Sequence, residues 1–291
     1  MSEIAPIWVD AIEYPFKHRW FDTPDGRLHY IDEGAGEVVL FVHGNPSWSF
    51  EFRHVIRALR TRYRCVAIDH LGFGLSDKPR QGQYLPQDHA FRLASFVEHL
   101  ALSDLTLVTH DWGGPIGMAY AVDHPKNVRR IIASNTWFWS VKGEKHFESF
   151  SGLMGGPLGR FLCTTLNFFP KVGFSQAFGD KSKLTKKALT HFVRPFPTVA
   201  GRNGPWIFAR SIISESAWLE DLWSRREQLR DLPVLLFWGE ADDAFGLQEL
   251  HRWEEAFPLH TKKMLPGVGH FPFEEAGEDA VSPIEAFLKK A

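Results

Sequence analysis

The sequence LTLVTHDWGGPIGMAYA places a carboxylate where a buried strand is predicted to turn sharply into a helix. The residue at this turn is Asp111, and Gly113 and Gly114 follow it, as expected where a strand and a helix approach closely. Such a turn exposes a nucleophile, and a carboxylate there excludes ordinary serine esterase chemistry. A carboxylate would instead attack a saturated carbon that carries a good leaving group, and would form an ester. Taken alone, Asp111 could equally be the N-cap of the helix.

An ester intermediate needs a base that activates water, and the sequence MLPGVGHFPFEEA offers His270 in a glycine-rich loop. The acid that orients this histidine is expected after the preceding strand. There the sequence FWGEADDAF supplies two candidates, Asp242 and Asp243. The order of nucleophile, acid and histidine along the chain is the order found in α/β-hydrolases. These partners favour a catalytic role for Asp111 over a capping role.

Strands and helices that alternate along the chain must position these residues. Residues 19–33 contain a Pro-Asp-Gly turn between two short alternating runs and are predicted to form a hairpin. Six further runs are predicted to be strands, at 38–43, 64–69, 106–110, 130–134, 234–238 and 262–265. This alternation predicts an α/β protein with a mostly parallel, doubly wound sheet.

Helices are expected on both sides of this sheet, at 53–59, 88–100, directly after the turn at Asp111, and at 281–290. The helix at 88–100 is amphipathic, and its apolar face is predicted to consist of Phe91, Ala94, Val97 and Leu100.

The alternation stops between about residues 137 and 224, where helical patterns are separated by glycine and proline. This indicates a helical cap, residues 137–224, inserted into a core domain made of residues 1–136 and 225–291. The cap supplies aromatic side chains that either pack against the core or line an apolar cavity. They are Trp137, Phe138, Trp139, Phe147, Phe150, Phe161, Phe168, Phe169, Trp206 and Phe208.

The composition limits the classes of function. The formal net charge of −2 does not suggest a surface that binds nucleic acid. No run approaches the roughly 18 apolar residues that a membrane span needs. Cys65 and Cys163 lack the spacing of metal ligands and are interpreted as buried thiols, which suits a reducing compartment. We therefore expect a cytoplasmic enzyme.

Three stretches together resemble the haloalkane dehalogenases: HGNPSWSF at 43–50, HDWGG at 110–114 and GVGHFPFEE at 267–275. The resemblance covers nearly the whole chain and is weakest in the cap. HDWGG alone is shared with epoxide hydrolases, but its combination with HGNP is more specific. The resemblance implies an α/β-hydrolase fold with an inserted helical cap. It also implies hydrolysis of a carbon–halogen bond in a small apolar haloalkane, with water, to a primary alcohol, a halide and a proton.

The resemblance also assigns roles. Asp242 is preferred to Asp243 as the acid, because it stands three residues after Gly239, as in the usual Gly-x-x-Asp turn of the family. Some relatives carry this acid after the strand that ends near residue 134, but Asn135 occupies that region here.

The side chains of Asn45 and Trp112 are implied to bind the halide, and their backbone N–H groups to form the oxyanion hole. This combination of acid and donors resembles the third subfamily, whose members tend to form homo-oligomers. No metal and no cofactor is required.

Several alternatives remain open. An epoxide hydrolase would use the same aspartate and histidine, together with cap tyrosines that protonate the ring oxygen. None of the five tyrosines lies between residues 137 and 224; they are Tyr14, Tyr30, Tyr63, Tyr84 and Tyr120.

A fluoroacetate dehalogenase would carry arginine where Trp112 stands. A luciferase-like oxygenase and a non-enzymatic binding module are further alternatives, and the intact Asp111, His270 and Asp242 argue against the binding module.

Overall fold

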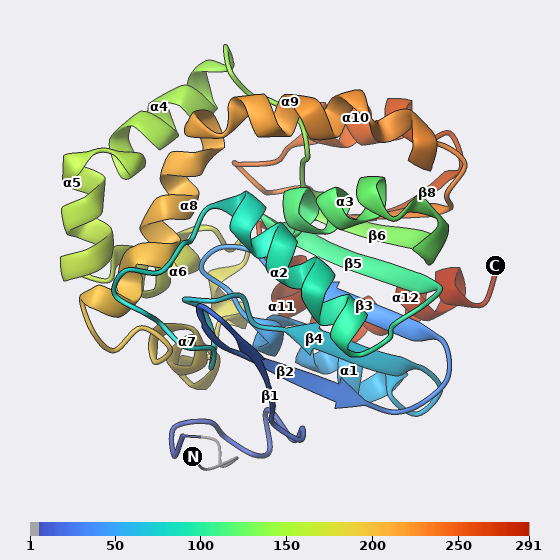
Figure 1. Ribbon diagram of the computed structural model, residues 1–291, viewed down its shortest axis with the longest axis horizontal. Coiled ribbons are helices and arrows are strands. Elements are labelled where there is room, and N and C mark those ends of the chain that lie inside the picture. Colours follow the sequence, from blue (N-terminus) through green and yellow to red (C-terminus); the bar gives the residue numbers. More distant parts are fainter. Residues whose placement is uncertain (1–5, 291) are drawn as a thin grey trace.

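The computed structural model describes residues 6–290; residues 1–5 and 291, which belong to the predicted core domain, lie outside the described residues. Within the described residues, eight strands form one sheet in the order β1-β2-β4-β3-β5-β6-β7-β8 (Figure 1). Their bounds are β1 Arg19–Thr23, β2 Gly26–Glu33, β3 Val38–Val42, β4 Arg64–Ile68, β5 Leu105–Asp111, β6 Val128–Thr136, β7 Val234–Gly239 and β8 His260–Leu265.

Strands β1 and β2 form the predicted hairpin, and β2 pairs with β4 in the antiparallel sense. All the other neighbours in the sheet are parallel. The predicted mostly parallel sheet is therefore confirmed, and each of the six predicted strands is present with its ends shifted by at most two residues.

Alternate residues of the central strands pack against opposite helical layers. Leu40 and Val42 belong to the core cluster that includes side chains of α2 (Pro86–His99) and α3 (Gly113–Asp123). Val39 and Phe41 belong to the cluster that includes α1 (Arg53–Leu59) and α12 (Val281–Leu288). Successive side chains of a strand point to opposite faces, so a continuous apolar run fits a strand buried on both sides. Figure 1 shows α2 and α3 on one face of the sheet and α1 and α12 on the other.

The predicted apolar face of α2 was partly wrong. Phe91 is 75% exposed, and the hydrophobic side chains that α2 buries are Ala90, Leu93, Phe96 and Val97. At 3.6 residues per turn, Phe91 and Val97 lie about 120° apart around the helix axis, so one narrow face cannot bury both.

Residues 137–233, all of which the structure describes, contain helices and no strand. The α-helices are α4 (Lys145–Gly155), α5 (Pro157–Arg160), α6 (Phe174–Gln176), α7 (Lys186–Val193), α8 (Asn203–Ser214) and α9 (Ser216–Ser224). Helices α4, α5 and α8 gather on the side of the molecule away from the C-terminus (Figure 1). The division into core and cap at residues 136/137 and 224/225 stays a prediction. No helix in the described part of the chain is both long and apolar enough to span a bilayer.

Candidate active site

Asp111 lies at a crowded turn at the end of β5. Its φ angle is +48°, a left-handed conformation that side-chain-bearing residues rarely adopt. A Cβ atom on Gly113 would lie 1.9 Å from the carbonyl oxygen of Val42, and one on Gly44 would lie 2.2 Å from Oδ1 of Asp111. Glycine is therefore required at both positions, because β3, the turn and α3 approach too closely for a side chain.

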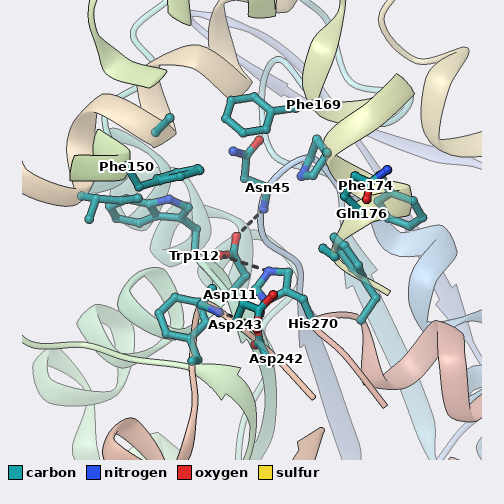
Figure 2. Close-up of a pocket in the computed structure, with 18 of the residues that line it drawn as sticks. Asn45, Asp111, Trp112, Phe150, Phe169, Phe174, Gln176, Asp242, Asp243 and His270 are labelled. Carbon is teal, nitrogen blue, oxygen red and sulfur yellow. Dashed lines mark hydrogen bonds and ion pairs between the residues drawn. The ribbon is translucent and has the colours of Figure 1, made fainter. Parts of the chain in front are cut away.

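The Asp111 carboxylate is 7% exposed and receives backbone donors. The N–H of Asn45 donates to Oδ1 at 2.5 Å (Figure 2). Burial raises the pKa of Asp111 above its ordinary value, and the charges of His270 and His110 and the N–H groups of Asn45 and Trp112 offset only part of this rise. These neighbours favour the ionised form, which is the nucleophilic one.

His270 follows β8 and faces both carboxylates. Its Nδ1 donates to Oδ2 of Asp242 at 2.9 Å, and its Nε2 lies 3.7 Å from Oδ2 of Asp111 (Figure 2). Its backbone N–H donates at 2.8 Å to the carbonyl of Ala177. The imidazole is thus placed between the two acidic side chains that the sequence singled out.

Asp242 is held by a residue whose function the sequence analysis missed. Nδ2 of Asn135 donates to Oδ2 of Asp242 at 2.9 Å, while Oδ1 of Asn135 accepts the N–H of Gly239 at 2.8 Å. The N–H of Ala244 donates to Oδ1 of Asp242 at 2.8 Å. The position of Asn135 near the end of β6 was the available signal, but it was interpreted only as the lack of a carboxylate. Asp243 is exposed and has no hydrogen bond or ion pair within residues 6–290.

The charges around His270 favour its protonated form. Burial lowers the pKa of His270, but the charge and hydrogen bond of Asp242, together with the charges of Asp111 and Glu51, raise it to about 9. For Asp242, burial raises the pKa, and the charge and hydrogen bond of His270 with the donors of Ala244 and Asn135 outweigh this and lower it. These charges therefore favour an imidazolium at neutral pH, placed between Asp242 and Asp111.

The two predicted halide donors lie beside Asp111. Trp112 is almost fully buried, and its ring packs against Trp137 and Phe208, with centroids 4.7 and 5.2 Å away. No hydrogen bond to a described residue occupies its indole N–H. Nδ2 of Asn45 donates at 3.3 Å to the carbonyl of Pro205 in α8, which leaves a second amide hydrogen available.

A cavity of about 450 Å³ lies beside the predicted site residues. Asn45, Asp111, Trp112, Asp242 and His270 line it, and Asp243 does too. Most of the rest of its wall is apolar, and no tyrosine is among the described lining residues. Of the aromatic side chains predicted to be in the cap, four line the cavity: Phe147, Phe150, Phe168 and Phe169. Phe174, Phe178 and Phe245, which the sequence analysis did not single out, line it as well.

Among residues 6–290, one group of side chains has the spacing of metal ligands. Single ligand atoms of Glu144, His146 and Glu249 lie within 4.8 Å of one another. His146 also lines the cavity, but the carboxylates of this group are distinct from Asp111 and Asp242. Ester formation on Asp111 and hydrolysis with His270 as the base do not require Glu144, His146 or Glu249.

Comparison with known proteins places the chain in a family. A family model described as the alpha/beta hydrolase fold matches residues 37–277, which confirms the predicted fold. Haloalkane dehalogenase 2 of Mycobacterium tuberculosis is 39% identical over 279 residues, 94% of this chain and 96% of the relative. The chain belongs to the haloalkane dehalogenase family.

Two other known proteins are also similar to this chain. The solved structure of a haloalkane dehalogenase from Agrobacterium tumefaciens C58 superimposes with a TM-score of 0.84 at 24% identity, covering 94% of this chain and 96% of that one, which supports the shared fold. The family member described here is also similar to a cis-3-alkyl-4-alkyloxetan-2-one decarboxylase of Shewanella oneidensis. That identity is 30%, over 94% of this chain and 89% of the relative.

Asp242→Asn should lower the pKa of His270, because it removes the largest of the contributions that raise that pKa. Asp243→Asn, the matched control, removes an exposed carboxylate with no contact to the ring and should leave the pKa nearly unchanged. Titration of ¹⁵N-labelled histidine by NMR measures both. A larger shift in the Asp243 variant would transfer the orienting role to Asp243.

Proposed function

We propose that this member of the haloalkane dehalogenase family hydrolyses the carbon–halogen bond of small apolar haloalkanes through an ester on Asp111. One observation carries the proposal. A buried carboxylate lies in an apolar cavity beside two neutral donors, Asn45 and Trp112, and beside an imidazole that a second carboxylate holds. The name of the mycobacterial relative supports the same reaction.

In the first step an oxygen of Asp111 displaces the halide from carbon in line. A new carbon–oxygen bond forms, and the halide leaves with the electron pair of the broken bond. The indole N–H of Trp112 and the amide of Asn45 stabilise this anion, because donors fixed in a largely apolar cavity stabilise charge more than they would in water. Neither donor is negatively charged, so neither repels the departing ion.

In the second step His270 acts as a base. In the free enzyme the charge of Asp111 helps to raise the pKa of His270. Conversion of Asp111 to a neutral ester removes this contribution, so the pKa falls and the imidazole becomes available as a base. It deprotonates a water that attacks the ester carbonyl, while Asp242 stabilises the imidazolium that forms. The backbone N–H groups of Asn45 and Trp112 stabilise the oxyanion, and the alcohol and a proton are released.

Epoxide hydrolysis by the same nucleophile is less well supported. Opening an epoxide requires a proton donor near the ring oxygen, and tyrosines would supply it. The described residues that line the cavity include no tyrosine. The oxetanone decarboxylase relatives provide the second candidate, decarboxylation of a four-membered lactone, at 30–31% identity. The higher identity to the dehalogenase and the two halide donors favour dehalogenation.

We also propose a cytoplasmic location and a homo-oligomeric state. Both cysteines are free and buried, which fits a reducing compartment. Several large apolar side chains are exposed in the helical segment, which is a common property of surfaces that associate. They are Leu153, Leu158, Phe161 and Leu166.

A substrate panel tests the proposed reaction. The purified protein should release halide and a primary alcohol from 1-bromobutane and 1-chlorobutane. It should form no diol from an epoxide and no carbon dioxide from a cis-3,4-dialkyloxetan-2-one. Asp111→Ala serves as the inactive control. Carbon dioxide release without halide release would replace the proposed reaction by the decarboxylation.

The halide donors provide a separate prediction. Asn45→Ala should reduce dehalogenation by roughly 10²–10³, the effect of losing one fixed donor to a developing anion. Bromide should quench the tryptophan fluorescence of the wild-type protein, and Trp112→Phe should weaken bromide binding in a fluorescence titration. Trp206→Phe is the matched control, because Trp206 is outside the cavity lining and donates to Gly155. Near-native activity in both donor variants would remove these residues from the mechanism.

A further inference from the structure

A buried glutamate lies behind the active site and contacts neither Asp111 nor the imidazole of His270 directly. Glu51 belongs to the short 3-10 helix Ser49–Phe52 and is 1% exposed. Its Oε2 lies 3.2 Å from Nδ1 of His110, and its Oε1 has no hydrogen-bond partner among the described residues. Arg53, two residues further along, is paired with Glu274 and Glu13 and does not neutralise Glu51. Burial of a carboxyl group in this way requires a specific partner, and that partner is His110.

His110 connects Glu51 to the catalytic histidine. Nε2 of His110 lies 2.6 Å from the backbone carbonyl oxygen of His270. A carbonyl oxygen can only accept, so Nε2 carries a hydrogen. The imidazole of His110 is fully buried and lies 5.0 Å from the ring of His270, centroid to centroid.

The two contacts of His110 fix the number of protons that the His110 imidazole and the Glu51 carboxyl group carry together. Because Nε2 already carries a hydrogen, the contact between Nδ1 and Oε2 of Glu51 needs one more proton; without it, two lone pairs would face each other. This proton lies between Glu51 and His110, and the pair has no net charge whichever of the two residues holds it. Glu51, His110 and the His270 carbonyl thus form a continuous hydrogen-bonded relay.

We infer that Glu51 is a positioning residue that acts through His110 to hold His270 in place for hydrolysis of the ester. The backbone of His270 is then fixed on both sides, by Ala177 at its N–H and by His110 at its carbonyl. This inference rests on the proposed function, because it concerns the step in which His270 is the base. Alkylation of Asp111 does not use that base and should not depend on the relay.

The chemistry of the relay defines a set of variants. Glu51→Gln keeps the shape of the side chain and supplies an amide N–H to Nδ1 of His110, so it preserves the relay. Glu51→Leu removes the partner of Nδ1, and His110→Phe removes the donor to the His270 carbonyl. Phe52→Leu is the matched control, because Phe52 lies in the same segment, is fully buried and carries no polar group.

Two rates are measured with a 1-bromoalkane by rapid quench and intact-protein mass spectrometry: halide release in the first turnover, and loss of the alkyl adduct. Glu51→Leu and His110→Phe should each slow loss of the adduct by about tenfold, the effect of one hydrogen bond. Halide release by Glu51→Leu should stay within about twofold of wild type; His110→Phe also changes the surroundings of Asp111, so it is compared only in the loss of the adduct. The double variant should be no slower than either single variant, since residues of one network are not additive. Glu51→Gln should restore the wild-type rate.

Several results would overturn the inference. Wild-type loss of the adduct in Glu51→Leu would exclude a role for Glu51, and a Glu51→Gln rate as slow as that of Glu51→Leu would exclude the relay. Parallel loss of both rates, together with a melting temperature lowered as in Phe52→Leu, would show a purely structural role.

A second measurement needs only the wild-type protein, so it tests the relay even if the variants do not fold. It also tests the relay independently of the reaction. ¹⁵N-histidine NMR of the wild-type protein should show Nε2 of His110 protonated and Nδ1 hydrogen-bonded. An unprotonated Nε2 would overturn the relay. A wild-type protein that releases no halide would refute the proposed function, whereas a normal wild-type enzyme with an unaffected Glu51→Leu variant would refute only this inference.

Discussion

The contact between the Asp111 carboxylate and the His270 imidazole, 3.7 Å apart, is the interaction on which the other features of the site depend. Each group is fixed by a different part of the fold. Asp111 is held at a left-handed turn that only glycine neighbours can accommodate, and His270 is held by Asp242 and by backbone contacts. Asp111 ends β5 and His270 follows β8, so both lie at the carboxyl edge of the parallel strands, where such sheets place their ligand sites. Two strands, β6 and β7, separate β5 from β8, so the contact depends on the loop after β8, which brings His270 back to the end of β5.

The same contact explains why two chemical steps can share one site. While Asp111 is charged, it attracts the imidazolium and needs no base. Once Asp111 carries an alkyl group, that attraction is lost and the imidazole is free to accept a proton from water. Asp242 retains its charge in both states, so the histidine stays oriented throughout. The apolar wall of the cavity strengthens each of these effects because it excludes water that would screen them.

The sequence was sufficient for features that depend on local patterns. Continuous apolar runs predicted the strands, and the motif order predicted which residues lie together in the cavity. Features that depend on distant contacts were not predictable. Asn135 looked like a missing acid, and its hydrogen bond to Asp242 depends on the alignment of β6 with the loop after β7. Glu51 lies next to a recognisable motif, but its partner His110 comes from another strand. Phe91 was misplaced because apolar residues three apart do not specify which helix face is buried.

The central claim is that the reaction passes through an ester on Asp111, and His270→Phe tests it most directly. The variant retains the nucleophile and the halide donors but lacks the base for the second step. With a 1-bromoalkane it should release one equivalent of bromide and then stop. Mass spectrometry should show one added alkyl group, and peptide mapping should place it on Asp111. If the variant binds the substrate but gives neither bromide nor adduct, while the wild-type enzyme turns the substrate over, the covalent mechanism is contradicted.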